Sequence, residues 1–177
     1  RYGSEVRFVD PDAPGGLAAV VDDKTRLVFA ETVGNPRGNV VDLDAWSEAA
    51  HALGLPLVID NTVATPILTR GRDHGADIVV HSLTKFIGGH GTSIGGVIVD
   101  NGTFDWTAHA DRYPGLTQPD PSYHGVVWSD APGPAAYIGR LRTVLLRNTP
   151  AALSPSPPLR LLLRAATFTP LLPRHSD

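Results

Sequence analysis

Up to about residue 100, short apolar runs alternate along the chain with stretches that have the periodicity of amphipathic helices. The apolar runs predict strands at residues 5–10, 26–32, 55–61, 76–82 and 94–100. The stretches between them predict helices at residues 15–23, 42–54 and 67–75, the second with Asp42 or Asp44 as its cap and Gly54 at its end. Strands that alternate with helices predict an α/β fold, with a mainly parallel sheet and helices on both faces. In such folds the functional residues lie at the carboxyl ends of the strands.

The pattern changes beyond residue 100. Residues 106–128 are rich in proline, aromatic and turn residues, which predicts an extended excursion rather than a new core. Residues 133–148 predict an amphipathic helix with one apolar face, formed by Ile138, Leu141, Val144 and Leu145. The last stretch mixes apolar residues with prolines and fits neither a helix nor a strand. We therefore divide the chain into a core (1–105), an excursion with its helix (106–153) and an aberrant Pro-rich tail (154–177).

Composition narrows the function classes. The 177 residues are 42% hydrophobic, which suits one domain, and the net charge of −3 gives no field that would attract nucleic acid or an anionic membrane. Cysteine is absent, which excludes disulfides, thiolate metal sites and cysteine nucleophiles and is compatible with the cytoplasmic location that we predict. Methionine is also absent and no signal pattern is visible, so we expect the chain to begin in mid-protein. The only two lysines are Lys24 and Lys85, the two candidates for chemistry that needs a deprotonatable amine.

Asp60 and Lys85 are the first pair of candidate site residues. Asp60 ends the apolar run "LVID", where a carboxylate is costly to bury without a partner, although a turn aspartate or a helix cap is the more common use of this position. Lys85 follows 25 residues later, about the length of one crossover between parallel strands, so both residues are predicted at one edge of the sheet. A carboxylate that faces a pyridine nitrogen favours its protonated form, and a lysine amine can form an imine with an aldehyde.

The two hydroxyls just before this lysine suit a phosphate group. In an extended backbone Ser82 and Thr84 point to one side and Lys85 to the other. The alternative is a hydrogen-bonded turn from strand to loop. The glycines of "FIGGHG" permit positive φ or close backbone approach, with ordinary turn use as their alternative.

The spacing of residues excludes other common binding and catalytic motifs. A P-loop places its lysine after the glycines, whereas Lys85 precedes them, and a dinucleotide fingerprint that starts at Gly89 would need glycine in place of Ile94. A G-x-S-x-G nucleophile elbow is missing. The histidines have no spacing typical of metal ligands, so we predict no metal site.

The run "DIVVHSLTKFIGGHG" resembles the cofactor-attachment signature of the Cys/Met-metabolism family of pyridoxal-phosphate enzymes. "ETVGNPRGNVVDL" and "LPLVIDNTVATPILTRGRDHGADIVVHS" are similar to the segments that flank it. "RYPGLTQPDPSYHGVVW" and "GPAAYIGRLRTVLLRNTPAALSP" resemble the O-acetylhomoserine sulfhydrylase branch. The resemblance covers residues 4 to about 155 and implies the large domain of a fold-type I enzyme, with residues 1–105 as the core of the cofactor-binding domain.

The resemblance implies a role for each candidate residue. Lys85 would be the Schiff-base lysine and the catalytic proton carrier, Asp60 the partner of the pyridine nitrogen, and Ser82 and Thr84 phosphate ligands, while Asn35 of "GNP" would lie near the cofactor. The implied enzyme is a transferase of methionine biosynthesis. It replaces the acetate of O-acetylhomoserine with sulfide or a thiol, gives homocysteine or methionine, and assembles as dimers or tetramers.

Two departures from the family pattern leave alternatives open. Family members are longer, with an N-terminal part that supplies further phosphate contacts and an aromatic ring, and a C-terminal domain that carries an arginine for the substrate carboxylate. After "ALSP" the tail departs from the family and returns to it at "RHSD", so we hypothesise a local reading-frame shift there. The alternatives are a non-catalytic remnant of such an enzyme and a cystathionine synthase or lyase of the same family, from which the stretch "PDPSYHG" distinguishes this chain.

Overall fold

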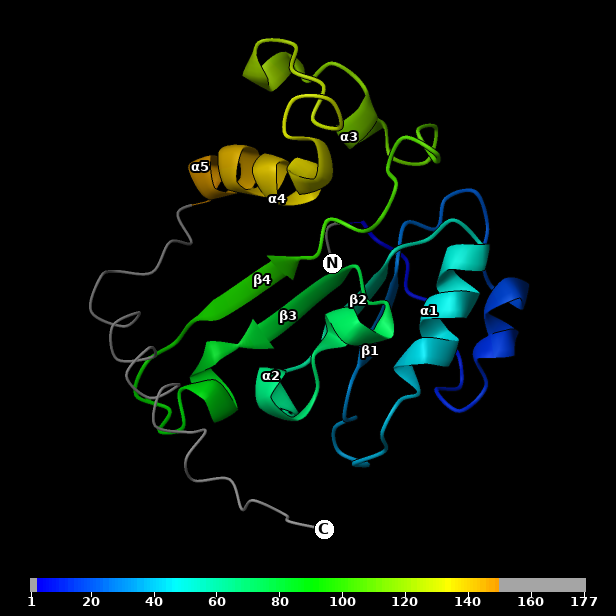
Figure 1. Cartoon of the computed structure of the whole chain (residues 1–177), viewed down its shortest axis with the longest axis vertical. Coiled ribbons are helices and arrows are strands. Elements are labelled where there is room, and N and C mark those ends of the chain that lie inside the picture. Colours follow the sequence, from blue (N-terminus) through cyan, green and yellow to red (C-terminus); the bar gives the residue numbers. More distant parts are fainter. Residues whose placement is uncertain (1–2, 150–177) are drawn as a thin grey trace.

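The computed structural model of the chain describes residues 3–149. Its centre is one four-stranded sheet, in the spatial order β1-β2-β3-β4 (Figure 1). The strands are β1 (Val28–Glu31), β2 (Leu57–Asp60), β3 (Ile78–Ser82) and β4 (Gly96–Asp100). The first three are parallel, and β4 pairs antiparallel with β3. The prediction of a mainly parallel sheet is therefore confirmed, and the carboxyl ends of the three parallel strands meet at one edge.

Four of the five predicted strands form, but the prediction of a strand at residues 5–10 is wrong. This segment pairs with no strand, and two of its apolar side chains, Val6 and Phe8, are 62% and 90% exposed, whereas Val9 packs against the core. The run "EVRFVD" has the composition of a strand, but strand formation also requires a neighbouring edge with matching hydrogen bonds.

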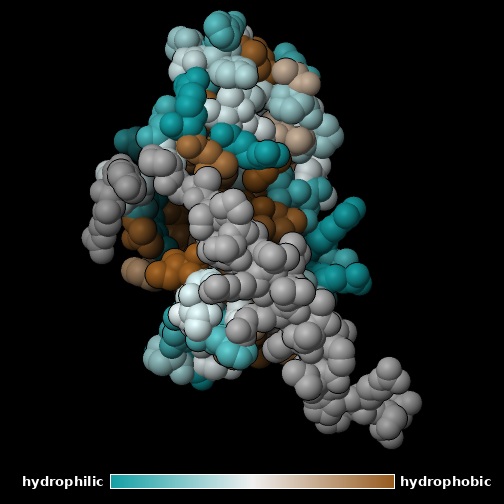
Figure 2. All heavy atoms as spheres, turned by 90° about the vertical axis from the view of Figure 1, so that its left-hand side faces the viewer, coloured by the Kyte–Doolittle hydropathy of each residue, from teal (hydrophilic) through white to brown (hydrophobic). Residues whose placement is uncertain are grey.

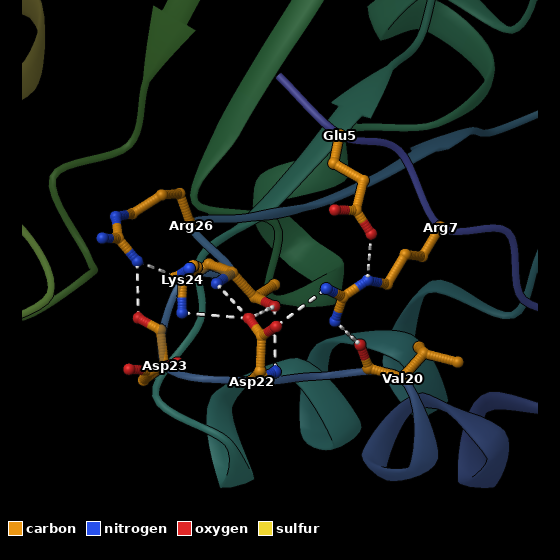
Figure 3. A network of polar contacts seen from close by, with 8 residues as sticks. Glu5, Arg7, Val20, Asp22, Asp23, Lys24 and Arg26 are labelled. Carbon is orange, nitrogen blue, oxygen red and sulfur yellow. Dashed lines mark hydrogen bonds and ion pairs between the residues drawn. The ribbon is translucent and has the colours of Figure 1, made fainter. Parts of the chain in front are cut away.

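Polar contacts of Arg7 hold this N-terminal segment instead (Figure 3). The Arg7 guanidinium donates to Glu5 Oε1 at 2.7 Å, to the Val20 carbonyl at 2.7 Å and to Asp22 Oδ2 at 2.8 Å. The hydrogen bond from Arg7 lowers the pKa of the Asp22 carboxyl to about 2. Both partners are exposed, so the network orients the segment without building a core.

One face of the sheet packs against α1 (Leu43–Ala52) and the short helix η1 (Pro14–Ala19). Asp42 caps α1 by accepting from the Ala45 N–H at 3.1 Å, and the chain leaves the helix through Gly54, whose φ is +66°. This confirms the predicted helix. The apolar core of this face contains Leu17, Val28, Val41, Leu43, Trp46, Ala50, Leu55, Leu57, Ile59, Ala76 and Val79.

Two other predicted helices are shorter than expected. The helix predicted at residues 15–23 is limited to the 3₁₀ turns of η1. The helix predicted at residues 67–75 is split into α2 (Thr65–Leu68) and η2 (Gly71–His74), because Thr69 and Arg70 are extended. Gly71, directly after the two extended residues, is a weak helix former, which is consistent with the break at this point.

The opposite face of the sheet packs against residues 106–137, and here the prediction of an excursion without a core is wrong. Trp106, Tyr113 and Trp128 are only 7%, 8% and 4% exposed, and they pack against Val58 and Ile78 of the sheet. The helical segments of this region are α3 (Pro114–Thr117), η4 (Pro121–Tyr123), η5 (Gly133–Ala135) and α4 (Ala136–Arg140). Together with α1 on the other side they confirm a sheet with helices on both faces.

The helix predicted at residues 133–148 is present as consecutive turns. After α4 it continues through a wider turn, η6 (Leu141–Leu145), into α5 (Leu146–Asn148). On the predicted apolar face, Ile138, Leu141 and Val144 are half-buried, whereas Leu145 is 50% exposed. The tail predicted at residues 154–177 lies outside the described residues.

Strand β4 is the least covered part of the sheet. Successive side chains of a strand point to opposite faces, yet Val97, Ile98 and Val99 are 37%, 36% and 42% exposed, so neither face of β4 is fully covered. The side of the molecule that carries β4 shows a band of apolar atoms (Figure 2). Within residues 3–149 we find no helix that meets the length and hydrophobicity of a membrane span.

Candidate functional site

The five predicted site residues lie on three neighbouring segments at the carboxyl edge of the parallel strands. Glu31 at the end of β1 is in register with Asp60 at the end of β2, and Asp60 is in register with Val80 of β3. Asn35 follows β1, Asp60 ends β2, and the stretch from Ser82 to Lys85 ends β3 and continues beyond it. The topology therefore brings the ends of three segments, far apart in sequence, to one edge.

The two oxygens of the Asp60 carboxylate have different surroundings: one closes a turn, and the other has no partner in the described residues. Its Oδ1 accepts from the Thr62 N–H at 2.9 Å, as in a turn that an aspartate side chain closes. Within residues 3–149 its Oδ2 accepts no hydrogen bond and forms no ion pair. One carboxylate oxygen thus shapes the turn, and the other is available to a hydrogen-bond donor at the edge of the sheet.

Lys85 is exposed and lies just beyond β3. It separates two short helical turns within η3 (Leu83–Ile87), where its backbone has the non-helical angles φ −89° and ψ −121°. Within the described part of the chain its amine makes no hydrogen bond and no ion pair. Lys24 precedes β1, and the three strands are parallel, so it lies toward the opposite edge of the sheet. Of the two lysines, only Lys85 shares an edge with Asp60.

Ser82 and Thr84 do not share one extended backbone, so the predicted alternation of their side chains is wrong. The strand ends at Ser82, and a helical turn starts at Leu83, whose N–H donates to the Gly95 carbonyl at 2.9 Å. Thr84 Oγ1 accepts from the Gly95 N–H at 3.0 Å and donates to the Gly95 carbonyl at 3.3 Å. Thr84 thus fastens the two ends of the glycine-containing loop, whereas the Ser82 hydroxyl makes no hydrogen bond within residues 3–149.

Asn35 and the glycine loop are open to solvent. The Asn35 N–H donates to Glu31 Oε2 at 2.9 Å, and its side chain is exposed. Gly89 and Gly91 have φ of +70° and +63°, the left-handed conformation that glycine permits and that was one of the alternatives left open for this loop. Within residues 3–149, apart from its chain neighbours, no heavy atom lies within 4 Å of the position that a Cβ would take at Gly91.

Three residues at this edge were missed by the sequence analysis: Asn61, Thr62 and His81. The Ser82 N–H donates to Thr62 Oγ1 at 2.8 Å, and His81 Nδ1 donates to the Asn61 carbonyl at 3.0 Å. Burial lowers the pKa of the His81 imidazole, against the smaller opposing effects of the Asn61 carbonyl and the Asp60 carboxylate. The signal that could have found the first two is the polar triplet "DNT" directly after a fully apolar strand.

A different cluster of polar residues lies at the opposite edge of the sheet. Asp77, which precedes β3, is 2% exposed and accepts from His51 Nε2 and from the Leu57 N–H, each at 2.8 Å, and from Thr103 Oγ1 at 3.0 Å. A cleft of about 250 Å³ borders this cluster and includes His109. Because both carboxylate oxygens of Asp77 accept hydrogen bonds, we interpret this cluster as structural.

The family model described as "Cys/Met metabolism PLP-dependent enzyme" matches residues 1–143. A sulfhydrylase of Fusarium oxysporum is 46% identical over 178 aligned positions, which cover 100% of this chain and 41% of the relative. The homocysteine synthase of Schizosaccharomyces pombe is 46% identical over 176 residues, 99% of this chain and 41% of the relative. The chain therefore spans about two fifths of the length of these curated relatives.

Among solved structures, the fold is similar to a Campylobacter jejuni protein assigned as an O-acetylhomoserine (thiol)-lyase. The TM-score is 0.83 at 34% identity, over 90% of this chain and 39% of that one. That structure contains N'-pyridoxyl-lysine-5'-monophosphate.

Proposed function

The chain belongs to the Cys/Met-metabolism family of pyridoxal-phosphate-dependent enzymes, and from this premise we propose that it is the lysine-bearing part of an O-acetylhomoserine sulfhydrylase. The observation that carries the proposal is the position of Lys85, the one lysine that shares the carboxyl edge of the sheet with Asp60. The 46% identity to a sulfhydrylase and to a homocysteine synthase supports the choice of reaction.

The residues at this edge fit the three functional groups of pyridoxal phosphate. An aldehyde needs a primary amine, which Lys85 presents without a competing ion pair in the described residues. A protonated ring nitrogen needs an anionic acceptor, and Asp60 Oδ2 has no other partner in this part of the chain. A phosphate needs donors at a loop, and the Ser82 hydroxyl is unpaired there, whereas the Thr84 hydroxyl is already bonded to Gly95. We therefore assign the phosphate first to Ser82 and to Thr84 second.

Each of these residues has its own role in the proposed reaction. When bound, pyridoxal phosphate supplies a ring that withdraws electrons from the substrate carbons. Asp60 keeps the ring nitrogen protonated, and Ser82 orients the phosphate. The Lys85 amine, released by the incoming amino acid, moves protons at the α and β carbons of O-acetylhomoserine. Acetate leaves from the γ carbon and sulfide or a thiol adds there, which gives homocysteine or methionine.

The first experiment locates the attachment point. The chain is mixed with pyridoxal phosphate, reduced with borohydride, digested and analysed by mass spectrometry. We expect the pyridoxyl mass on the peptide that contains Lys85, unchanged in Lys24→Arg and absent in Lys85→Arg. Because the chain has only two lysines, each variant is a matched control for the other. Equal labelling of Lys24 and Lys85, or no labelling of a folded sample, would contradict the proposal.

The second experiment identifies the nucleophile. O-Acetylhomoserine is supplied with sulfide, methanethiol or cysteine, and the products are homocysteine, methionine or cystathionine. A preference for cysteine would favour a cystathionine synthase of the same family over the sulfhydrylase.

A second candidate, a non-catalytic remnant, is favoured by the exposure of Val97, Ile98 and Val99 on β4. It predicts self-association, and we propose a homo-oligomer in the cytoplasm for the active protein as well. Light scattering after size-exclusion chromatography separates the two when it is combined with the labelling experiment: an oligomer that is labelled at Lys85 supports the enzyme, and one that is not supports the remnant.

A further inference from the structure

Asn61 follows β2 directly, between Asp60 and Thr62, and its side-chain amide is buried and hydrogen-bonded at both ends. It is 1% exposed, its Oδ1 accepts from Thr32 Oγ1 at 2.9 Å, and its Nδ2 donates to the Thr69 carbonyl at 2.7 Å. A buried amide costs free energy unless its donors and acceptors are paired, and here both ends are paired. The side chain thereby links the end of β1 to the segment after α2.

The backbone of Asn61 extends the same links to β3. Its N–H donates to the Val80 carbonyl at 2.9 Å, and its carbonyl accepts from the Thr65 N–H at 2.9 Å and from His81 Nδ1 at 3.0 Å. Asn61 is therefore held by β1, β3 and α2 at once. A residue fixed from three directions leaves its two neighbours in the chain little freedom to move.

These neighbours are Asp60 and Thr62, and each reaches the candidate site. Asp60 presents its unpaired Oδ2 to the edge of the sheet, and Thr62 Oγ1 accepts from the Ser82 N–H at 2.8 Å, just ahead of Lys85. We propose that Asn61 is a positioning residue, which sets the distance between the Asp60 carboxylate and the Ser82–Lys85 turn and so prepares both for one cofactor. The inference rests on the proposed function, because it assumes that Asp60 and Lys85 hold pyridoxal phosphate.

Two pairs of variants test this proposal. In each pair, the test variant lies at the edge of the candidate site and the control variant lies at the opposite edge of the sheet. Asn61→Asp keeps the shape of the side chain but replaces the donor to the Thr69 carbonyl with an acceptor. Asp77→Asn makes the reverse exchange at the opposite edge, at a residue that is also 2% exposed or less and has three partners. The milder pair is Thr32→Val and Thr103→Val, each of which removes one hydroxyl donor, to Asn61 and to Asp77 respectively.

The first measurement needs no cofactor. Hydrogen exchange of the Ser82 amide is followed in the chain without pyridoxal phosphate, under conditions in which circular dichroism shows each variant folded. We expect Asn61→Asp to speed this exchange about tenfold, because the link through Thr62 loosens, and Thr32→Val to speed it less. The two control variants should leave Ser82 unchanged. Unchanged exchange in both Asn61→Asp and Thr32→Val would overturn the inference.

The second measurement is the affinity for pyridoxal phosphate, with the ¹⁵N chemical shift of the labelled ring nitrogen as the report on Asp60. We expect Asn61→Asp to raise Kd about tenfold and to move the shift toward the unprotonated ring, with smaller changes of the same sign in Thr32→Val. A purely structural role would raise Kd equally in Asp77→Asn and leave the shift of the bound ring unchanged, which would also overturn the inference. Failure of the unaltered chain to bind would instead contradict the proposed function, and Ser82 exchange would still decide the role of Asn61.

Discussion

The Tyr113 hydroxyl ties residues 106–137 to the edge of the sheet opposite the candidate site. Its removal tests the second core, the apolar cluster that these residues form with Val58 and Ile78 of the sheet. The phenol donates to the Arg26 carbonyl at 3.1 Å and to the Gly54 carbonyl at 3.2 Å. Burial raises the pKa of this phenol to about 12, as expected for a hydroxyl that is held away from water. Tyr113→Phe removes the hydroxyl and keeps the ring, which packs edge-to-face on Trp106 at 5.0 Å.

The expected loss in free energy of unfolding follows from the hydrogen bonds that the Tyr113 hydroxyl makes. One hydroxyl proton is shared between two carbonyls, so the loss corresponds to one neutral hydrogen bond plus the incomplete pairing of two carbonyl groups, about 1–2 kcal/mol in all. With a urea m-value of about 2 kcal/mol/M for a chain of this size, the unfolding midpoint should fall by about 0.5–1 M. Tryptophan fluorescence follows this transition, since Trp106 and Trp128 both lie in the second core.

Tyr137 provides the control. It stacks on Trp106 at 5.9 Å, and within residues 3–149 its hydroxyl makes no hydrogen bond, so Tyr137→Phe should change the midpoint by less than about 0.2 M. The m-value should stay constant in both variants. A Tyr113→Phe variant as stable as the unaltered chain would refute the reasoning, because residues 106–137 would then not be anchored at this edge. Binding of pyridoxal phosphate should be unaffected, since Tyr113 and the candidate site lie at opposite edges.

Three further predictions test other parts of the structure. Because burial lowers the folded pKa of His81 below its ordinary value near 6.5, the unfolded chain binds more protons, and stability should fall as the pH drops from about 7.5 to 5.5; His81→Gln should reduce this dependence in urea titrations, and an unchanged pH profile would contradict it. Gly75→Ala should lower the free energy of unfolding by about 1–3 kcal/mol, because φ is +76° there and a Cβ would overlap Ser47 Oγ; a variant as stable as the original would contradict this prediction. Thr84→Val should make residues 86–94 more sensitive to limited proteolysis because the Gly95 N–H loses its acceptor, whereas Thr84→Ser should not, and equal cleavage of the two variants would argue against the role of this hydroxyl.

Local sequence patterns predicted part of the candidate site. Asp60 and Lys85 were placed at one edge from the length of a single crossover, and the parallel pairing of β2 and β3 agrees with that prediction. The prediction that Ser82 and Thr84 point away from Lys85 was wrong, because it assumed an extended backbone and β3 stops at Ser82. At the end of β3, the Leu83 N–H donates to the carbonyl of Gly95, a residue too distant in sequence for a local pattern to predict the contact.

The sequence by itself determined the positions of four strands and of α1, the exit of α1 at Gly54, two candidates for its cap (Asp42 and Asp44), and the segments that reach the carboxyl edge. These features follow from periodicity, from capping residues and from the geometry of parallel crossovers, all of which act over short distances. Only the tertiary structure decided that residues 106–137 form a second core, that residues 5–10 find no strand to pair with, and that Asn61 joins three segments. Burial and hydrogen bonding at these places depend on partners that are distant in the chain, so the same residues have no fixed role until the fold brings those partners together.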